Sequence, residues 1–268
     1  MKRIIMSDIV KKLGELLKEY TTGIEYKNKY YKYPWKITTG LSSLDEIING
    51  GLYPYRAYLF YGEAGTGKSQ LAMQIAASGV LIGREVGKDR VIYIDTEGSF
   101  NPDRVLTFLR YLIKKSNIKS EGEVNLYRLL NSILVGKVRN IDSLLLLLDK
   151  SLSFIDRSIL LLVDNIANPL LTIEKRTPAI LFKILRRILN RLVILSGYPI
   201  SIVITSRVYS LVKLPISSAL QPYGGITLGG FIDYEILLSR ENNIIKLINV
   251  YGNKVAYMKI TSEGIVEA

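Results

Sequence analysis

Short apolar runs alternate with longer amphipathic segments along most of the chain, a pattern typical of a sheet whose strands are joined by helices. The apolar runs predict strands at residues 56–61, 91–95, 132–135, 159–164 and 201–205. The segments between them predict helices at residues 69–81, 104–115, 143–155 and 178–196. Right-handed crossovers then give an α/β fold with a mostly parallel twisted sheet flanked by helices. Its ligand site is expected at the carboxyl ends of the strands.

Both ends of the chain depart from this alternation. Residues 7–20 predict an amphipathic helix, and residues 21–36 interleave five aromatic side chains with lysines, which predicts an extended arm. Near the other end, residues 233–238, 244–250 and 255–260 predict strands that tight turns make antiparallel. We therefore expect an N-terminal helix and Tyr/Lys-rich arm at 1–36 and an α/β core at 37–268.

Composition removes several kinds of chemistry from consideration. The chain has 268 residues with no Cys and no His, which excludes disulfides, thiolate nucleophiles and the usual zinc sites. Any general base must therefore be Asp, Glu, Lys or Tyr. No apolar run approaches the ~18–20 residues of a membrane span, and the N-terminus lacks a signal-peptide pattern. We expect a soluble, cytoplasmic protein, with a composition that is compatible with a thermophilic source.

The formal net charge of +12 attracts polyanions, because neutralising phosphates releases their counterions. Residues 1–40 contain nine Lys/Arg and four Asp/Glu, so they carry a large part of the excess. A solvated basic surface is the alternative explanation. Charge therefore points toward nucleic acid without identifying a site.

A glycine-rich octet follows the first predicted strand of the core. Its residues are Gly62, Glu63, Ala64, Gly65, Thr66, Gly67, Lys68 and Ser69. This spacing, G-x-x-x-x-G-K-S, lets backbone N–H groups curl around phosphates, with Lys68 reaching the β/γ-phosphates and the Ser69 hydroxyl ligating Mg²⁺. The apolar strand before it and the apolar helix after it favour a phosphate-binding loop over an incidental glycine-rich turn.

Two carboxylates follow other predicted strands and so belong to the same edge of the sheet. Asp164 ends the apolar run 159–164, as expected of a carboxylate directed at a metal through water. Glu97 lies just beyond the run 91–95, where it could orient and deprotonate a water. The alternative is that Glu97 caps a loop and Asp95 only terminates its strand.

Several stretches together resemble the core of RecA-type recombinases, specifically archaeal RadA, from about residue 37 to 268. They are Thr38–Glu46, Asn49–Leu52, the glycine-rich loop with Gln70 and Leu71, Ile92–Phe100 with Pro102–Arg104, Gly224–Gly225 and Lys259–Ile265. The resemblance implies that Glu97 and Lys68 are catalytic and that Lys68, Ser69 and Asp164 hold ATP with Mg²⁺. It also implies that Gln70 contacts the nucleotide and that Arg104 lies near the adenine.

The resemblance further implies two DNA-binding loops, at about 166–177 and 208–225. The cations expected to contact DNA are Lys175 and Arg176 in the first loop, Lys213 in the second, and Arg187 in the helix after the first loop. That helix carries Lys183, Arg186, Arg187 and Arg191 on its outer face, which is either a solvated face or one that follows phosphates.

Departures from the RadA pattern point to an accessory role. Only about 36 residues precede the core, and they show no Phe-x-x-Ala tether of the kind that joins recombinase subunits. Arg207 stands where the family has a glutamine that couples the γ-phosphate to the DNA loop, so Arg207 is expected to contact nucleotide or DNA phosphate. The segment between Asn249 and Val255 is short and lacks the stretch that caps a neighbouring subunit's ATP.

We therefore expect a RadA paralogue similar to RadB and RadC-like proteins, which hydrolyses ATP weakly, binds single-stranded DNA and assists a RadA-type recombinase. A strand-exchange recombinase and a KaiC-like nucleotide-gated scaffold or signalling ATPase without a DNA role are the alternatives. The resemblance leaves a homo-oligomer open and gives no reason to expect a membrane partner. The Tyr/Lys-rich arm at 26–36 could pack on its own core, contact a partner or stack on DNA bases.

Overall fold

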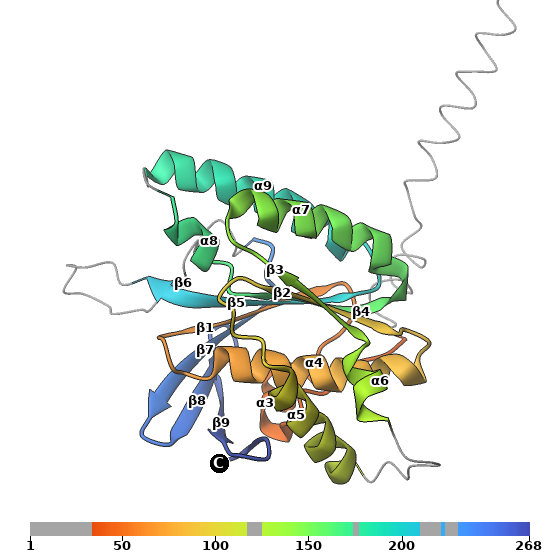
Figure 1. The fold of residues 1–268 in the computed structure, drawn as a ribbon. Coiled ribbons are helices and arrows are strands. Elements are labelled where there is room, and N and C mark those ends of the chain that lie inside the picture. Colours follow the sequence, from red (N-terminus) through yellow and green to blue (C-terminus); the bar gives the residue numbers. More distant parts are fainter. Residues whose placement is uncertain (1–33, 117–124, 174–176, 210–220, 223–229) are drawn as a thin grey trace, which may run out of the picture. The chain divides into compact units, whose positions relative to one another are not determined.

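A long sheet runs through the middle of the core, and helices cover both of its faces (Figure 1). The computed structural model describes residues 34–116, 125–173, 177–209, 221–222 and 230–268. The chain divides into two units, Met1–Pro34 and Trp35–Ala268. Trp35, expected in the arm, is 8% exposed and belongs to the hydrophobic core of the second unit. The other aromatic residues of the arm and the helix expected at 7–20 lie outside the described residues.

Six described strands of this sheet are parallel, three more continue it in antiparallel fashion, and a fourth antiparallel strand pairs with β5 off this path. The strand order is β10-β9-β8-β7-β1-β5-β4-β2-β3, with β6 paired to β5. The parallel strands are β1 (Arg56–Gly62), β2 (Arg90–Asp95), β3 (Ile133–Lys137), β4 (Ser158–Asp164), β5 (Ser201–Tyr209) and β7 (Tyr234–Glu241). The antiparallel strands are β6 (Gln221–Pro222), β8 (Ile244–Asn249), β9 (Lys254–Ile260) and β10 (Ile265–Glu267). The mostly parallel sheet predicted from the sequence is confirmed.

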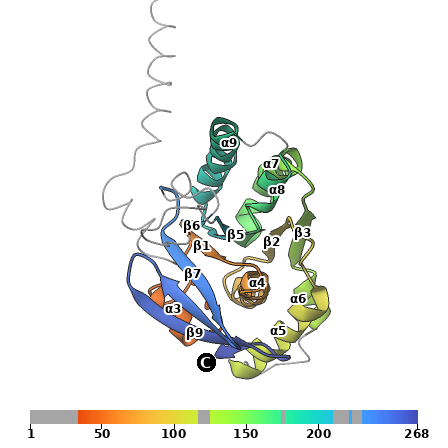
Figure 2. The same cartoon turned by 90° about the vertical axis from the view of Figure 1, so that its left-hand side faces the viewer.

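The helices form two layers, which Figures 1 and 2 show on opposite sides of the sheet. One layer contains α3 (Ser42–Ile47), α4 (Lys68–Glu85), α5 (Pro102–Lys115) and α6 (Leu126–Leu130). The other contains α7 (Ile141–Ser151), the 3-10 turn η1 (Leu152–Arg157), α8 (Asn168–Leu171) and α9 (Pro178–Ser196). Each layer buries its own apolar cluster against the sheet. Strands in the middle are therefore buried on both faces, and all seven residues of β4 are buried.

The local expectations were close, with differences that have local causes. The helix expected at 143–155 begins at Ile141, because Asn140 caps it and accepts a hydrogen bond from the Ser143 N–H. It ends at Ser151 and continues only as the 3-10 turn η1. The last three predicted strands are antiparallel to one another, but β7 also pairs in parallel with β1. This pairing joins the C-terminal strands to the strand that enters the glycine-rich loop.

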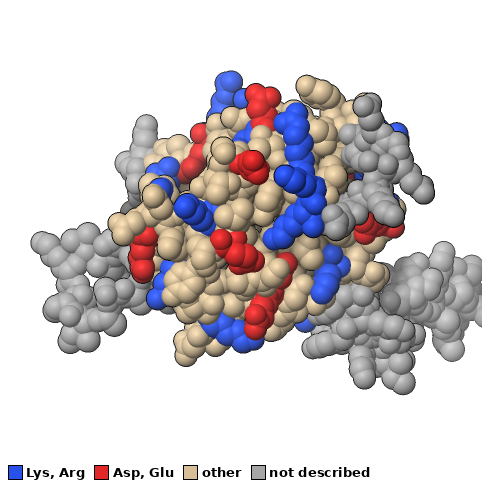
Figure 3. Space-filling view, turned by 90° about the horizontal axis from the view of Figure 1, so that it is seen from below, with Lys and Arg blue, Asp and Glu red and all other residues tan. Residues whose placement is uncertain are grey.

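The helix layer below the sheet shows no separation of charge. Figure 3 shows Lys/Arg and Asp/Glu side chains interspersed over this face. No helix in the described part of the chain is long and apolar enough to cross a membrane.

Candidate nucleotide-binding site

Five adjacent parallel strands bring polar groups to one edge of the sheet. From β7 to β2 their carboxyl ends carry Arg240, the glycine-rich loop after Gly62, Arg207, Asp164 and Asp95. Parallel strands end at the same edge, so residues far apart in sequence meet there. The predicted loop, Asp164 and Glu97 are brought together in this way, as the bonds described below show.

Close packing explains why two positions of the loop are glycines. A Cβ at Gly62 would lie 2.3 Å from the Leu238 carbonyl oxygen of β7. At Gly67, where φ is +84°, a Cβ would lie 2.7 Å from Ile260 Cδ1 of β9. Helix α4 starts directly after Gly67 without a side-chain cap. Its first N–H groups therefore have no intrahelical partner and favour an anion.

Lys68 lies inside the loop rather than in solvent, with only 8% of its surface exposed. Its ammonium donates to the carbonyl oxygens of Gly62 at 3.0 Å and Glu63 at 2.6 Å. Burial lowers the pKa of Lys68, while the nearby carboxylates of Glu97 and Asp164 oppose this shift. The Lys68 ammonium is therefore close enough to interact electrostatically with both predicted carboxylates.

The Asp164 carboxylate accepts four hydrogen bonds, and the residue is only 1% exposed. Oδ1 accepts from the hydroxyls of Ser69 at 3.2 Å and Thr205 at 2.5 Å. Oδ2 accepts from Tyr93 at 2.7 Å and Ser99 at 3.0 Å. Burial first, and Asp164 second, raise the pKa of Tyr93, so its hydroxyl stays protonated and donates. Four separate segments are therefore joined through one carboxylate.

The donor types at Ser69 and Asp164 fit a magnesium ion. A hydroxyl oxygen and a carboxylate oxygen 3.2 Å apart are hard oxygen donors. Mg²⁺ commonly takes one or two protein oxygens and fills its remaining positions with water and phosphate oxygens. Ser69 lies in the first turn of α4, next to the loop, which suits an ion shared with a phosphate.

Asp95 builds the turn that carries Glu97, a role that the sequence interpretation missed. Its Oδ1 accepts from the backbone N–H groups of Glu97 at 3.1 Å, Gly98 at 2.8 Å and Ser99 at 3.1 Å. Its Oδ2 accepts from the Phe100 N–H at 3.1 Å. An Asp followed by a Gly three residues later, which here has φ of +73°, was the available signal for such a turn.

The Glu97 carboxylate accepts two hydrogen bonds on one oxygen and forms an ion pair with Arg207. Oε1 accepts from Asn165 Nδ2 at 3.0 Å and from Arg207 Nε at 3.0 Å, and Arg207 Nη2 lies 2.9 Å from the same oxygen as an ion pair. Asn165 is 1% exposed, and its Oδ1 accepts from the Ala167 N–H at 2.9 Å. Sequence reasoning did not single out Asn165, because an Asn after a strand has many ordinary uses. Arg207 meets Glu97 directly, a contact that was not expected.

Arg104 of α5 and Gln70 of α4 are joined by a hydrogen bond. Arg104 Nε donates to Gln70 Oε1 at 2.8 Å, and its two terminal nitrogens donate to the carbonyls of Ser262 and Thr261. The guanidinium also lies 4.3 Å from the centre of the Phe108 ring. Arg104 thus connects α4, α5 and the turn before β10. Its expected position near an adenine is a separate prediction.

The residues expected at DNA are only partly placed. Arg187 lies on the exposed side of α9 and accepts a hydrogen bond from Arg191 through its carbonyl. Lys175, Arg176 and Lys213 lie outside the described residues. The first expected loop contains the short helix α8. The described part of the second loop consists of the end of β5 and of β6, which pairs with β5.

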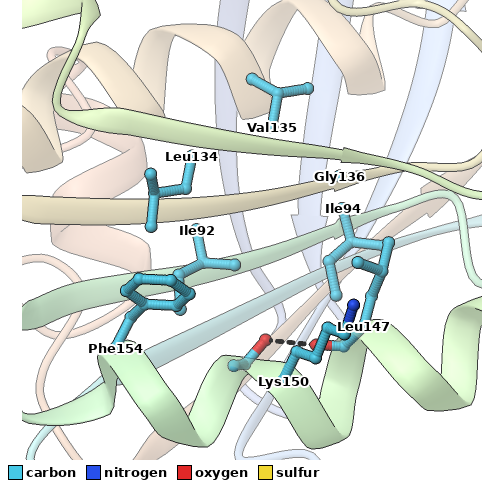
Figure 4. A pocket seen from close by; sticks show the side chains of 9 residues that line it. Ile92, Ile94, Leu134, Val135, Gly136, Leu147, Lys150 and Phe154 are labelled. Carbon is cyan, nitrogen blue, oxygen red and sulfur yellow. Dashed lines mark hydrogen bonds between the residues drawn. The ribbon is translucent and has the colours of Figure 1, made fainter.

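A separate apolar pocket of about 210 Å³ opens beside β3, which is the last strand of the described sheet on that side. Figure 4 shows Ile92 and Ile94 of β2, Leu134 of β3 and Leu147 of α7 around it, with Phe154 at one end. Lys150 is the cation in its lining. The pocket is distinct from the polar edge described above.

A protein-family model described as Rad51 matches residues 32–267, which is most of the chain. The match includes every described residue of the polar edge.

Asp95 offers a direct test of how this edge is built. We expect Asp95→Ala to lower the free energy of unfolding by about 2–4 kcal/mol, because four buried or half-buried N–H groups lose their acceptor. Asp103→Ala, on the exposed start of α5, is the control and should change stability by less than about 1 kcal/mol. Urea unfolding of both variants checks this. Equal stability of Asp95→Ala and the wild type would show that Asp95 does not support the turn.

Proposed function

Because the chain belongs to the Rad51 family, with a RecA-like core, we propose that it is an ATP-binding, slowly hydrolysing RadA paralogue that assists homologous recombination. Family members in general bind ATP with Mg²⁺, and the family acts in recombination and repair. The observation that carries the proposal is the meeting of the loop lysine, Asp164 and Glu97 at one edge of the sheet. RadB and RadC-like proteins are the relatives we infer from the sequence departures.

Each residue of the edge has a role in this proposal. The N–H groups of Gly62–Ser69 cradle the phosphates, with Lys68 as the point charge, while Arg104 and Gln70 lie on the nucleoside side. Ser69 and Asp164 hold Mg²⁺, which would neutralise charge on the phosphates. Glu97 orients the attacking water.

Two features support a slow, accessory enzyme. Arg207, at the position of the family's glutamine, holds the Glu97 carboxylate in an ion pair. Only residues 250–253 separate β8 from β9, so the cap that a neighbouring subunit lays on ATP has no counterpart there.

The pocket beside β3 supports a protein partner of the recombinase type. β3 pairs with β2 on one side and is the last strand of the described sheet, so its other edge can pair with an extended segment. The apolar lining of the pocket fits the aromatic side chain of a Phe-x-x-Ala tether, which RadA-type subunits carry and this chain lacks. We infer that this chain receives the tether of a RadA-type recombinase.

Strand exchange is the second candidate function, favoured by the match of the Rad51 model over residues 32–267. A strand-exchange recombinase forms filaments on DNA, which electron microscopy detects directly.

For the nucleotide site we expect Lys68→Ala to abolish ATP binding and turnover, because the loop loses its phosphate cation. Glu97→Gln should bind ATP with unchanged affinity yet lower kcat by at least about 100-fold, the usual contribution of a positioned base. Steady-state kinetics and fluorescent-nucleotide binding separate the two effects. Undiminished hydrolysis in Glu97→Gln would remove Glu97 from this role.

For DNA we expect the affinity for single-stranded oligonucleotides to fall steeply with salt, with a log–log slope of about −3 for roughly four phosphate contacts. Arg187→Ala should make this slope shallower by about 0.7, the share of one contact. Arg157→Ala is the matched control, because Arg157 is exposed and already paired with Asp89. If no binding occurs at low salt, the KaiC-like scaffold without a DNA role becomes the better proposal.

For the partner we expect Val135→Lys to reduce capture of a RadA-type recombinase by at least about tenfold, which corresponds to 1.4 kcal/mol. Val135 lines the pocket and is 39% exposed, so a lysine there adds charge without disturbing the core. Val193→Lys is the matched control on α9, where Val193 is 51% exposed. Equal capture by both variants in a pull-down would exclude this docking site.

A further inference from the structure

The contact between Arg207 and Glu97 places a cation on the carboxylate that the proposed ATPase uses. Two hydrogen bonds, from Arg207 Nε and Asn165 Nδ2, and the ion-pair contact of Arg207 Nη2 converge on Oε1 at 2.9–3.0 Å. A carboxylate that orients water needs an oxygen lone pair directed at that water. The charged guanidinium and the Asn165 amide on this oxygen compete with the water for the same carboxylate.

The position of Arg207 shows what could compete for its guanidinium. In the parallel pairing of β1 with β5, Arg207 is the direct neighbour of Gly62, the first residue of the phosphate-binding loop. Its charge is close enough to contribute to lowering the pKa of Lys68, after burial. A phosphate held by that loop therefore lies in the electrostatic range of Arg207. Guanidinium groups bind phosphate and carboxylate with the same bidentate geometry.

Of the two groups that hold Glu97, Arg207 is the one that can move. Its side chain is 45% exposed and that of Glu97 is 22% exposed. Asn165, by contrast, is buried, and its carbonyl oxygen is fixed by the Ala167 N–H. A partly exposed ion pair contributes little net stability, so a phosphate oxyanion can exchange with the carboxylate.

We propose that Arg207 is a positioning residue that restrains Glu97 through this ion pair until a phosphate oxyanion accepts its guanidinium. The exchange moves no proton and breaks no covalent bond. It leaves Glu97 with its Asn165 bond and a carboxylate free to align water. The inference rests on the proposed ATPase function and adds a regulator to that site. The phosphate is either the terminal phosphate of the nucleotide or a phosphodiester of nucleic acid.

The test is ATP hydrolysis by Arg207→Gln, which keeps a hydrogen-bonding side chain but removes the charge. If the acceptor phosphate belongs to nucleic acid, we expect kcat without nucleic acid to rise about fivefold, the upper range for a weak ion pair. Arg207→Lys keeps the charge and should remain near the wild type. Arg157→Ala, which removes an exposed arginine from another ion pair, is the matched control and should leave kcat unchanged.

A double variant ties the gain to Glu97. In the Glu97→Gln background, adding Arg207→Gln should give no increase in kcat, because the carboxylate under restraint is gone. A fall in kcat of Arg207→Gln, or an equal increase in both backgrounds, would overturn the proposal.

Two further arms identify the phosphate. If it belongs to nucleic acid, a single-stranded oligonucleotide raises kcat of the wild type and has no effect on Arg207→Gln. If it belongs to the nucleotide, the oligonucleotide has no effect, and Arg207→Gln loses the preference for ATP over ADP. If neither of these two patterns is observed, the exchange is contradicted. A wild type with no hydrolysis above the Lys68→Ala background would instead contradict the proposed function itself.

Discussion

The buried carboxylate of Asp164 is the interaction on which the polar edge depends. A charge that is 1% exposed is stable only if hydrogen bonds replace its hydration. Four hydroxyl groups do so, from Ser69, Tyr93, Ser99 and Thr205. Because these residues come from α4, β2, the turn after β2 and β5, satisfying one charge fixes four segments. The glycine-rich loop at 62–69 is thereby held beside the strand ends.

A second buried carboxylate, that of Asp95, extends this arrangement to Glu97. It holds the turn after β2 by its N–H groups, as Asp164 holds its neighbours by hydroxyls. Glu97 then faces Asn165 and Arg207 from the next strand ends. Of the two residues that hold the Glu97 carboxylate, Arg207 is the exposed one, with 45% of its side chain accessible, whereas Asn165 is buried.

The sequence was sufficient where a feature depends on nearby residues. Strand and helix periodicity predicted the parallel sheet, and local spacing predicted the loop at 62–69 and the positions of Asp164 and Glu97. The sequence was insufficient where contacts between distant segments determine the geometry of the site. Gly62 is required by a carbonyl of β7, and the partners of Asp95 and Asn165 depend on backbone geometry that no motif spells out. The ion pair of Arg207 with Glu97 joins two residues that are 110 positions apart in the sequence.

Calorimetric titration of the purified chain with ATP, with and without Mg²⁺, tests the central claim most directly. The claim is that Ser69 and Asp164 hold a metal ion that the nucleotide shares with the loop. It predicts saturable binding of one ATP that tightens when Mg²⁺ is present, and the gain in affinity should disappear in Ser69→Ala. Binding that is indifferent to Mg²⁺, or the absence of ATP binding, would contradict it.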